Sequence, residues 1–150
     1  MYTIKKVNVI TLLDYEQAEL LFDLYAAESR SDTVPMHKPD RLMYTTLEDQ
    51  GMLDCIVVYK DDAIVGFTVI LTTKLPHYSA LSTTVESIFV LKDHRPRGTG
   101  LKLLQFAQDL ARERGSKMFF MSAPIDSKLN TTLSRTGMKA ISTVYSKDIS

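Results

Sequence analysis

The sequence has little of what crosslinked and metal-binding proteins need. It contains one cysteine, Cys55, and three histidines. A single cysteine excludes an intrachain disulfide and a cysteine-rich zinc site. Cys55 stands in an apolar run, residues 55–59, which predicts a buried and inert thiol rather than a nucleophile. The histidines, His37, His77 and His94, stand in separate connections without metal-ligand spacing, so we expect no metal.

Long apolar runs and an excess of charge of one sign are also absent. No segment approaches the roughly 18 apolar residues of a membrane span, and no basic start followed by an apolar run indicates a signal peptide. Lys plus Arg and Asp plus Glu number 18 each, so no overall field attracts nucleic acid or an anionic membrane. We therefore expect a protein of the reducing cytoplasm, with neither a membrane nor a nucleic acid as its partner.

What the chain does have is the composition of one ordinary globular domain. Its 150 residues are 45% hydrophobic and 24% charged, which is enough for one sizeable core. No repeat, low-complexity tract or linker divides it, so we expect a single domain over residues 1–150. Apolar periodicity and turn residues predict the elements. These are strands at 2–10, 53–60, 64–72, 83–91, 117–122 and 138–146, and helices at 14–29, 40–50, 98–114 and 127–136.

The order of these elements predicts a mixed sheet. The strands at 53–60 and 64–72 are close enough to form an antiparallel hairpin, and Gly66 indicates a bulge or a close approach of backbone. Residues 73–82 are interpreted as a polar connection. Residues 83–122 form a strand–helix–strand unit, which implies two neighbouring parallel strands. The expected fold class is therefore α/β with mixed (α+β) character: a central mixed sheet with helices on both faces, in a single three-layer domain.

The clearest chemical signal is a turn with two glycines between a predicted strand and a predicted helix. Gly98 and Gly100 let the backbone approach a bulky anion, and the free amides at the helix start carry partial positive charge. A diphosphate suits such a turn, and Arg95 and Arg97 add positive charge. The glycines are too close together for a P-loop, and Leu103 stands where a dinucleotide-binding fingerprint needs its third glycine.

This turn has the pattern Arg-x-x-Gly-x-Gly, at residues 95–100, after a strand that ends in Phe-Val. It resembles the coenzyme A loop of the GNAT acetyltransferase superfamily. The order of elements also matches, and Arg-Thr-Gly-Met at 135–138 resembles the superfamily's usual C-terminal Lys-x-Gly-Phe. The resemblance covers nearly the whole chain. It implies a GNAT-like fold, acetyl-CoA as cosubstrate, and acetyl transfer to a primary amine of a small molecule, or to a lysine or the N-terminus of a protein.

The resemblance also implies direct attack in a ternary complex, without a covalent enzyme intermediate. Backbone amides from Arg97 to Leu101 would hold the pyrophosphate, and the pantetheine arm would pair with the strand edge at 88–90. The amide of Val90 would polarise the thioester carbonyl and stabilise the oxyanion. The implied cofactor-binding residues are Ile88, Phe89, Val90, Arg95, Arg97, Gly98, Thr99, Gly100 and Leu101.

Candidates for the proton transfers follow from the same resemblance. Glu86 stands four residues before Val90, at the place of a glutamate in many GNAT enzymes, and is the candidate general base. The alternative for Glu86 is a solvated or salt-bridged strand residue. The usual general acid, a tyrosine in the last helix, is replaced by Leu133. Tyr145 is the candidate acid in its place, with Ser134 and water as alternatives; a Tyr145 packed in the final strand is the structural alternative.

Two other interpretations of the chain stay open. A relative that binds acyl-CoA as a sensor or interaction module, with weak catalysis, fits the loss of the tyrosine at Leu133. A nucleic-acid modifier rests only on basic residues around the turn, which coenzyme A phosphates and a solvated helix face explain more simply. Residues 30–41 form either a lid over the acceptor or a plain loop, and we favour the lid. The resemblance implies that the connections with His37 and His77 shape the acceptor pocket, and surface histidines without a role are the commoner alternative for both residues. Similar proteins often form homodimers, but neither an interface nor the acceptor is legible in the sequence.

Overall fold

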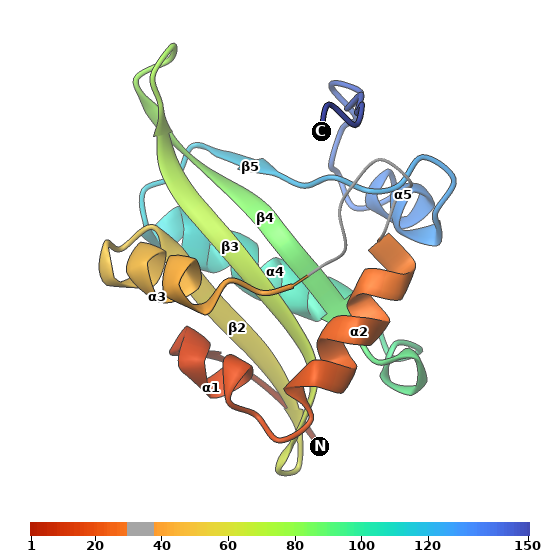
Figure 1. The fold of residues 1–150 in the computed structure, drawn as a ribbon. Coiled ribbons are helices and arrows are strands. Elements are labelled where there is room, and N and C mark those ends of the chain that lie inside the picture. The colour runs from red at the N-terminus through yellow and green to blue at the C-terminus, as the bar shows by residue number, and fades with distance from the viewer. Residues whose placement is uncertain (30–37) are drawn as a thin grey trace.

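A five-stranded mixed sheet forms the centre of the computed structural model, which describes residues 1–29 and 38–150. The strand order is β1-β2-β3-β4-β5, and helices cover both faces of the sheet (Figure 1). The strands are β1 (Tyr2–Val7), β2 (Leu53–Lys60), β3 (Ala63–Leu75), β4 (Ala80–Val90) and β5 (Met118–Phe120). The helices are α1 (Val9–Leu13), α2 (Ala18–Ser29), α3 (Arg41–Asp49), the 3-10 helix η1 (Lys92–His94), α4 (Thr99–Glu113) and α5 (Lys128–Leu133). The predicted mixed α/β fold is confirmed.

The predicted strand directions are confirmed for the hairpin of β2 and β3, which is antiparallel, and for the parallel pair of β4 and β5. β1 to β4 pair antiparallel, and β4 pairs with β5 in parallel. The parallel pairing joins only residues 82–84 of β4 to β5. Within the described part of the chain, residues 85–90 of β4 have no strand beside them on the β5 side. That edge of β4 is therefore open, at the end of the strand that leads into α4.

Alternation along the strands sends apolar side chains into two cores. In β2, Cys55 and Val57 pack with the layer formed by α1, α2 and α3. Their neighbours Ile56 and Val58 pack on the other face, against α4. The predicted burial of Cys55 is confirmed, and burial raises the pKa of its thiol to about 12. The thiol therefore stays protonated and inert at neutral pH.

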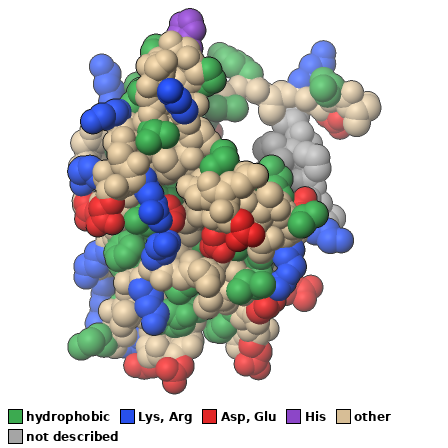
Figure 2. All heavy atoms as spheres, turned by 90° about the vertical axis from the view of Figure 1, so that its left-hand side faces the viewer, with side chains coloured by type: hydrophobic (Ala, Val, Ile, Leu, Met, Phe, Trp, Pro, Cys, Tyr) green, Lys and Arg blue, Asp and Glu red, His purple; other side chains and the backbone are tan. Residues whose placement is uncertain are grey.

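The surface carries charges of both signs. Figure 2 shows Lys and Arg side chains interspersed with Asp and Glu over the visible face, which fits their equal numbers in the sequence. Among the helices of residues 1–29 and 38–150, none combines the length and the apolar character that crossing a membrane requires.

The N-terminal strand is shorter than predicted. β1 ends at Val7, and α1 begins at Val9. Val9 and Leu12 are buried on one face of α1, at the three-residue spacing of a helix. Asp14 is the C-cap of α1, so the helix predicted at 14–29 begins only at Ala18, as α2. The predicted boundary was wrong because a short apolar run fits a strand and a single helical turn equally well.

The predicted polar connection at 73–82 is also wrong. β3 continues to Leu75 and β4 begins at Ala80, so the two strands form a long hairpin (Figure 1). Threonine favours strands, and polar residues can pair across a ladder. The hydroxyls of Thr72 and Thr83 do so, at 2.8 Å. Polarity alone therefore misled the prediction at this point.

The predicted final strand at 138–146 is wrong as well, because residues 138–150 form neither strand nor helix. The side chains of Ile141 and Val144 are 67% and 77% exposed. A strand needs a neighbour for its backbone hydrogen bonds, and β5 has only three residues. The helix before this segment is confirmed as α5, which Ser127 caps by accepting a hydrogen bond from the N–H of Asn130.

Candidate functional site

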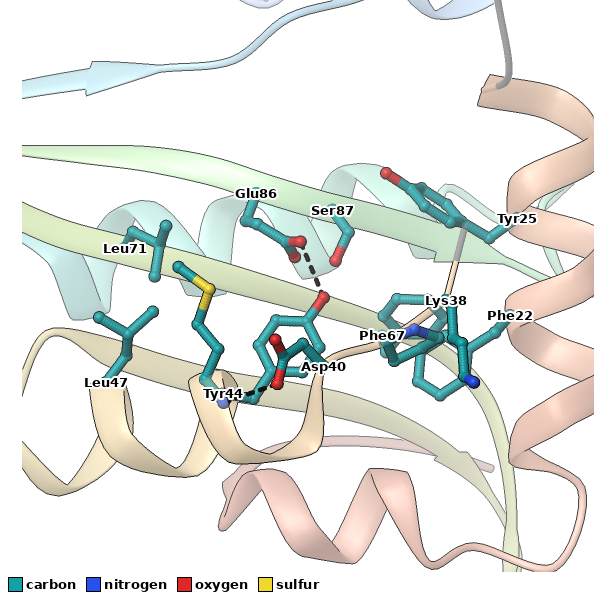
Figure 3. Close-up of a pocket in the computed structure, with 12 residues that line it drawn as sticks. Phe22, Tyr25, Lys38, Asp40, Tyr44, Leu47, Phe67, Leu71, Glu86 and Ser87 are labelled. Carbon is teal, nitrogen blue, oxygen red and sulfur yellow. Dashed lines mark hydrogen bonds between the residues drawn. The ribbon is translucent and has the colours of Figure 1, made fainter. Parts of the chain in front are cut away.

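A pocket of about 250 Å³ lies between α2, α3 and the central strands β3 and β4 (Figure 3). Its apolar lining consists of Phe22, Pro39, Met43, Leu47, Phe67 and Leu71. Its polar lining consists of Tyr25, Lys38, Asp40, Tyr44, Glu86 and Ser87. The strands supply one wall and the two helices supply the walls that face it. Of the lid predicted at 30–41, residues 30–37 lie outside the described residues, and residues 38–40 line the pocket.

Glu86 owes its position to a bulge in β4. In β3, Val69 pairs with Ser87. The next residue of β3, Ile70, pairs with Val85, so Glu86 is an extra residue in the ladder. The bulge interrupts the alternation of side chains, and Glu86 and Ser87 both line the pocket although they are consecutive. The sequence indicated the strand but gave no sign of the bulge.

Tyr44 holds the carboxylate of Glu86. Its hydroxyl donates a hydrogen bond to Oε1 of Glu86 at 2.8 Å (Figure 3). The start of α3 is fixed by Asp40, whose carboxylate accepts from the N–H of Met43 at 3.0 Å. Burial raises the pKa of Tyr44 far above its usual value, and the charge of Glu86 raises it further. The phenol therefore stays protonated at neutral pH and remains a donor.

A second phenol, Tyr25 of α2, also lines the pocket. Burial is the main reason that its pKa is raised, and the charge of Glu86 contributes in the same direction. Its ring lies edge-on to Phe67 and Phe89, with centroids 5.9 and 6.5 Å apart. Sequence reasoning missed both tyrosines as pocket groups. The available signal was a tyrosine on the inner face of a predicted helix, because a buried phenol needs a polar partner.

The glycine turn is open where α4 begins. Gly98 has φ = 73°, which favours glycine, and no side chain caps the helix. A Cβ atom added at Gly98 or Gly100 would meet nothing within 4 Å. Lys102 makes the first intrahelical bond, to the carbonyl of Gly98 at 3.0 Å. The amides of Thr99 and Leu101, and that of Gly100, precede this bond and suit an anion such as a diphosphate.

The end of β4 presents backbone groups at the open edge of the sheet. The N–H of Leu91 donates to the carbonyl of Val65 in β3 at 2.8 Å. Because backbone groups alternate in direction along a strand, the N–H of Val90 points away from β3, toward the open edge. Gly66 pairs with Val90, and a Cβ there would lie 3.0 Å from Cγ2 of Val90 and from the carbonyl of Phe89. The predicted close approach at Gly66 is confirmed.

Arg95 ties the glycine turn to the rest of the protein. Its Nε donates to the carbonyl of Val90 at 2.7 Å, and its Nη2 donates to both carboxylate oxygens of Glu28 at 2.8 and 2.9 Å. The guanidinium also lies 5.4 Å from the ring centroid of Phe89. Two of its nitrogens are thus committed to the protein, whereas Arg97 is exposed in the turn. The contact of both arginines with phosphate stays a prediction.

The structure does not bring Tyr145 to the pocket. The residue is 90% exposed, in the segment without regular structure, and Leu133 is buried. His77 lies exposed in the turn between β3 and β4, outside the pocket, and Nδ1 of His94 is 2.9 Å from the hydroxyl of Tyr2. His37, in the other segment that the resemblance assigns to the pocket, lies outside the described residues. In residues 1–29 and 38–150, no group of three or more His, Cys, Asp or Glu side chains could hold a metal ion.

Comparison with known proteins gives one family match. The model of the acetyltransferase (GNAT) family matches residues 18–128, which include the pocket, β4 and the glycine turn. No curated protein sequence matches the chain.

Solved structures with the same fold include three acetyltransferases that cover the whole chain. The ribosomal-protein-alanine N-acetyltransferase of Brucella melitensis biovar Abortus 2308 is 19% identical, with a TM-score of 0.73 over 100% of both chains. Glucosamine-6-phosphate N-acetyltransferase of Arabidopsis thaliana is 15% identical, with a TM-score of 0.76 over 100% of this chain and 99% of the other. An aminoglycoside acetyltransferase from an uncultured soil metagenomic sample is 17% identical, with a TM-score of 0.75 and the same coverage. At these identities the likeness concerns the fold.

Proposed function

The chain belongs to the acetyltransferase (GNAT) family, and on that premise we propose that it transfers the acetyl group of acetyl-CoA to a primary amine held beside Glu86. Membership of the family implies acetyl-CoA as the cosubstrate and an acetyl acceptor. The observation that carries the proposal is the bulge in β4, which turns Glu86 into the pocket on the strand whose end carries the amide of Val90. One strand thus presents a proton acceptor and an oxyanion donor together.

The glycine turn fits the diphosphate of coenzyme A. Its backbone is open at Gly98 and Gly100, and the uncapped start of α4 offers amides with partial positive charge. The open edge of β4 from Ile88 to Val90 would pair with the amide groups of the pantetheine arm. When bound there, acetyl-CoA supplies the thioester that is attacked.

The residues of the pocket supply the remaining chemistry. Glu86 takes the proton that the amine must lose, directly or through a water molecule. Tyr44 keeps the carboxylate in place through its hydrogen bond of 2.8 Å. The N–H of Val90 stabilises the negative oxygen that forms while the new C–N bond is made. The C–S bond then breaks, and the thiolate leaves.

The leaving thiolate needs a proton of its own. The usual position of the acid is occupied by Leu133, which has none to give, and Tyr145 is 90% exposed. We therefore propose water as the proton source, in place of Tyr145. This assignment needs no additional catalytic side chain. Leu133 has no proton to give and Tyr145 lies away from the pocket, and this lack of a side-chain acid is what favours the alternative function, a catalytically weak sensor that binds acyl-CoA.

A calorimetric titration with acetyl-CoA, followed by a thiol-release assay over a panel of amines, tests the proposal. Saturable binding with release of coenzyme A on addition of an amine supports the transferase. Binding without release from any amine favours the sensor. A protein that does not bind acetyl-CoA would contradict the assignment of the glycine turn.

A further inference from the structure

The pocket beside Glu86 has the size of a small acceptor. Its volume of about 250 Å³ lies below the roughly 300 Å³ at which pockets for drug-sized ligands begin. An acceptor built of several sugar rings, or a folded protein segment, does not fit inside such a volume. A single ring with a short chain does.

The apolar part of the lining has two aromatic rings, those of Phe22 and Phe67, at its centre. Phe67 is 1% exposed, and Phe22 lies edge-on to it with centroids 5.3 Å apart. Met43 and Leu47 of α3 and Leu71 of β3 complete this part of the lining. A flat apolar body gains contact and loses water here without requiring the walls to rearrange. A sugar or a polyamine would leave its polar groups unpaired against the same surface.

The charges around the pocket suit one positive charge. Two carboxylates and one ammonium, those of Glu86, Asp40 and Lys38, belong to the lining. The carboxylate of Asp40 is already engaged by the N–H of Met43 at the start of α3. Glu86 likewise accepts one hydrogen bond, from Tyr44. Together with the ammonium of Lys38, the two carboxylates leave the lining a net charge of −1, which suits one ammonium and disfavours a second.

On these observations we propose that the acceptor is a primary monoamine with a flat apolar body, such as an arylalkylamine. The inference rests on the proposed function, since it names the substrate of the same site. The ammonium lies at Glu86, which takes its proton, and the apolar body lies between Phe67 and the side chains of α3. Glu86 sets the position of the amine, and Met43 and Lys38 select against a second positive charge.

A comparison of amines tests the inference. Thiol release is measured with 2-phenylethylamine, 1,4-diaminobutane, an aminoglycoside and a lysine-containing peptide. We expect kcat/KM for 2-phenylethylamine to exceed that for each of the others by about tenfold or more, because the apolar body contributes on the order of one to two kcal/mol of additional binding. Preference for the diamine, the aminoglycoside or the peptide would overturn the inference and leave the proposed function standing.

A matched pair of variants places the acceptor in this pocket. Met43→Glu adds a negative charge to the lining, whereas Leu42→Glu adds the same charge to a side chain of α3 that is 76% exposed and outside the pocket. We expect Met43→Glu to raise the ratio of kcat/KM for the diamine to that for 2-phenylethylamine about fivefold. Leu42→Glu should change it less than about twofold. Equal changes in the two variants would overturn the inference.

Binding of the amine keeps the inference testable if no thiol is released. Calorimetry of the protein loaded with coenzyme A measures the affinity for 2-phenylethylamine and for 1,4-diaminobutane. If the wild type binds the monoamine more tightly than the diamine, and Met43→Glu loses this preference, the result supports the acceptor class even when no acetyl group is transferred. Binding of coenzyme A with no binding of the monoamine overturns the inference. Failure to bind coenzyme A would instead count against the proposed function.

Discussion

Glu86 is the residue on which the proposed chemistry depends. It stands outside the regular ladder of β4, it faces a pocket, and it accepts a hydrogen bond from Tyr44. A carboxylate in this position can take a proton from an amine that is bound by the apolar walls. Glu86 is exposed, so a solvated strand residue stays the alternative to the proposed base.

Replacement of Glu86 by glutamine removes the proposed base and keeps a side chain of nearly the same size and shape. A general base contributes about 100-fold or more to turnover, so we expect kcat of Glu86→Gln to fall by at least that factor, with affinity for acetyl-CoA within about twofold of the wild type. The measurement is thiol release between about pH 6 and 9, beside calorimetry. Glu113→Gln, an exposed residue of α4, is the control and should change neither value. Equal turnover of Glu86→Gln and the wild type would assign the role elsewhere.

Tyr44 contacts Glu86, and on the proposed function we expect it to act through Glu86 as a positioning residue. In Tyr44→Phe the carboxylate loses one donor while the ring stays in place, and we expect kcat to fall about tenfold, the cost of one hydrogen bond to a charged group. The Michaelis constant for acetyl-CoA should not change, because the glycine turn is untouched. Tyr59→Phe, outside the pocket, is the matched control. A loss of thermal stability that accounts for the fall in kcat would contradict the positioning role.

At the scale of elements, the start of α4 suits the anion that we propose for it. The 3-10 helix η1 joins β4 to the turn, and Arg95 links that turn to Val90 and Glu28 through hydrogen bonds. No side chain caps the start of α4. The turn therefore has a fixed backbone and an open surface. Both properties favour a diphosphate over a bound side chain.

Two glycines with nearly equal positive φ angles allow anion binding to be distinguished from backbone strain. Gly98 has φ = 73° and Gly51 has φ = 74°, and neither has a neighbour within 4 Å of a Cβ. Glutamate costs similar strain at both positions, but only at Gly98 does its charge face the proposed pyrophosphate. We expect Gly98→Glu to weaken acetyl-CoA binding by about 100-fold or more and Gly51→Glu by less than about twofold, measured by calorimetry. Similar losses in both would mean that α4 does not hold the anion.

At the scale of the whole molecule, one buried carboxylate joins the sheet to the end of α4. Asp54 of β2 is 4% exposed and accepts hydrogen bonds from Nε and Nη2 of Arg114 at 3.1 and 2.7 Å. Nζ of Lys6, in β1, is 3.8 Å away. The contact fixes the far end of the helix whose start forms the glycine turn. A buried charge that loses its partner is costly.

Removal of Arg114 should therefore lower stability. We expect Arg114→Met to lose about 2 kcal/mol of unfolding free energy, less than for a fully buried pair because Lys6 remains, and to lower the Tm by about 4–8 °C. Arg112→Met removes an exposed pair with Asp109 and should change stability by less than about 0.5 kcal/mol. Denaturant unfolding measures both. Adding Asp54→Asn to Arg114→Met should restore part of the loss, and its failure to do so would contradict this cause.

The sequence by itself determined the order of most elements, the parallel unit around α4 and the glycine turn. These features are local, because apolar periodicity, turn glycines and a motif of six residues each lie within a short stretch of chain. The candidate base, Glu86, came from the resemblance to GNAT enzymes, through its place four residues before Val90, and its role stays a prediction. Cys55 was placed in the core because its neighbours are apolar.

Only the tertiary structure decided what surrounds Glu86. The bulge depends on how β3 and β4 align, and Tyr25 and Tyr44 reach the pocket from two different helices. The final strand predicted at 138–146 failed for the same reason, since its formation depends on a partner that the short β5 does not supply. Pairing between distant segments is set by packing and hydrogen bonding across the fold, and a pattern within one segment carries no record of its partner.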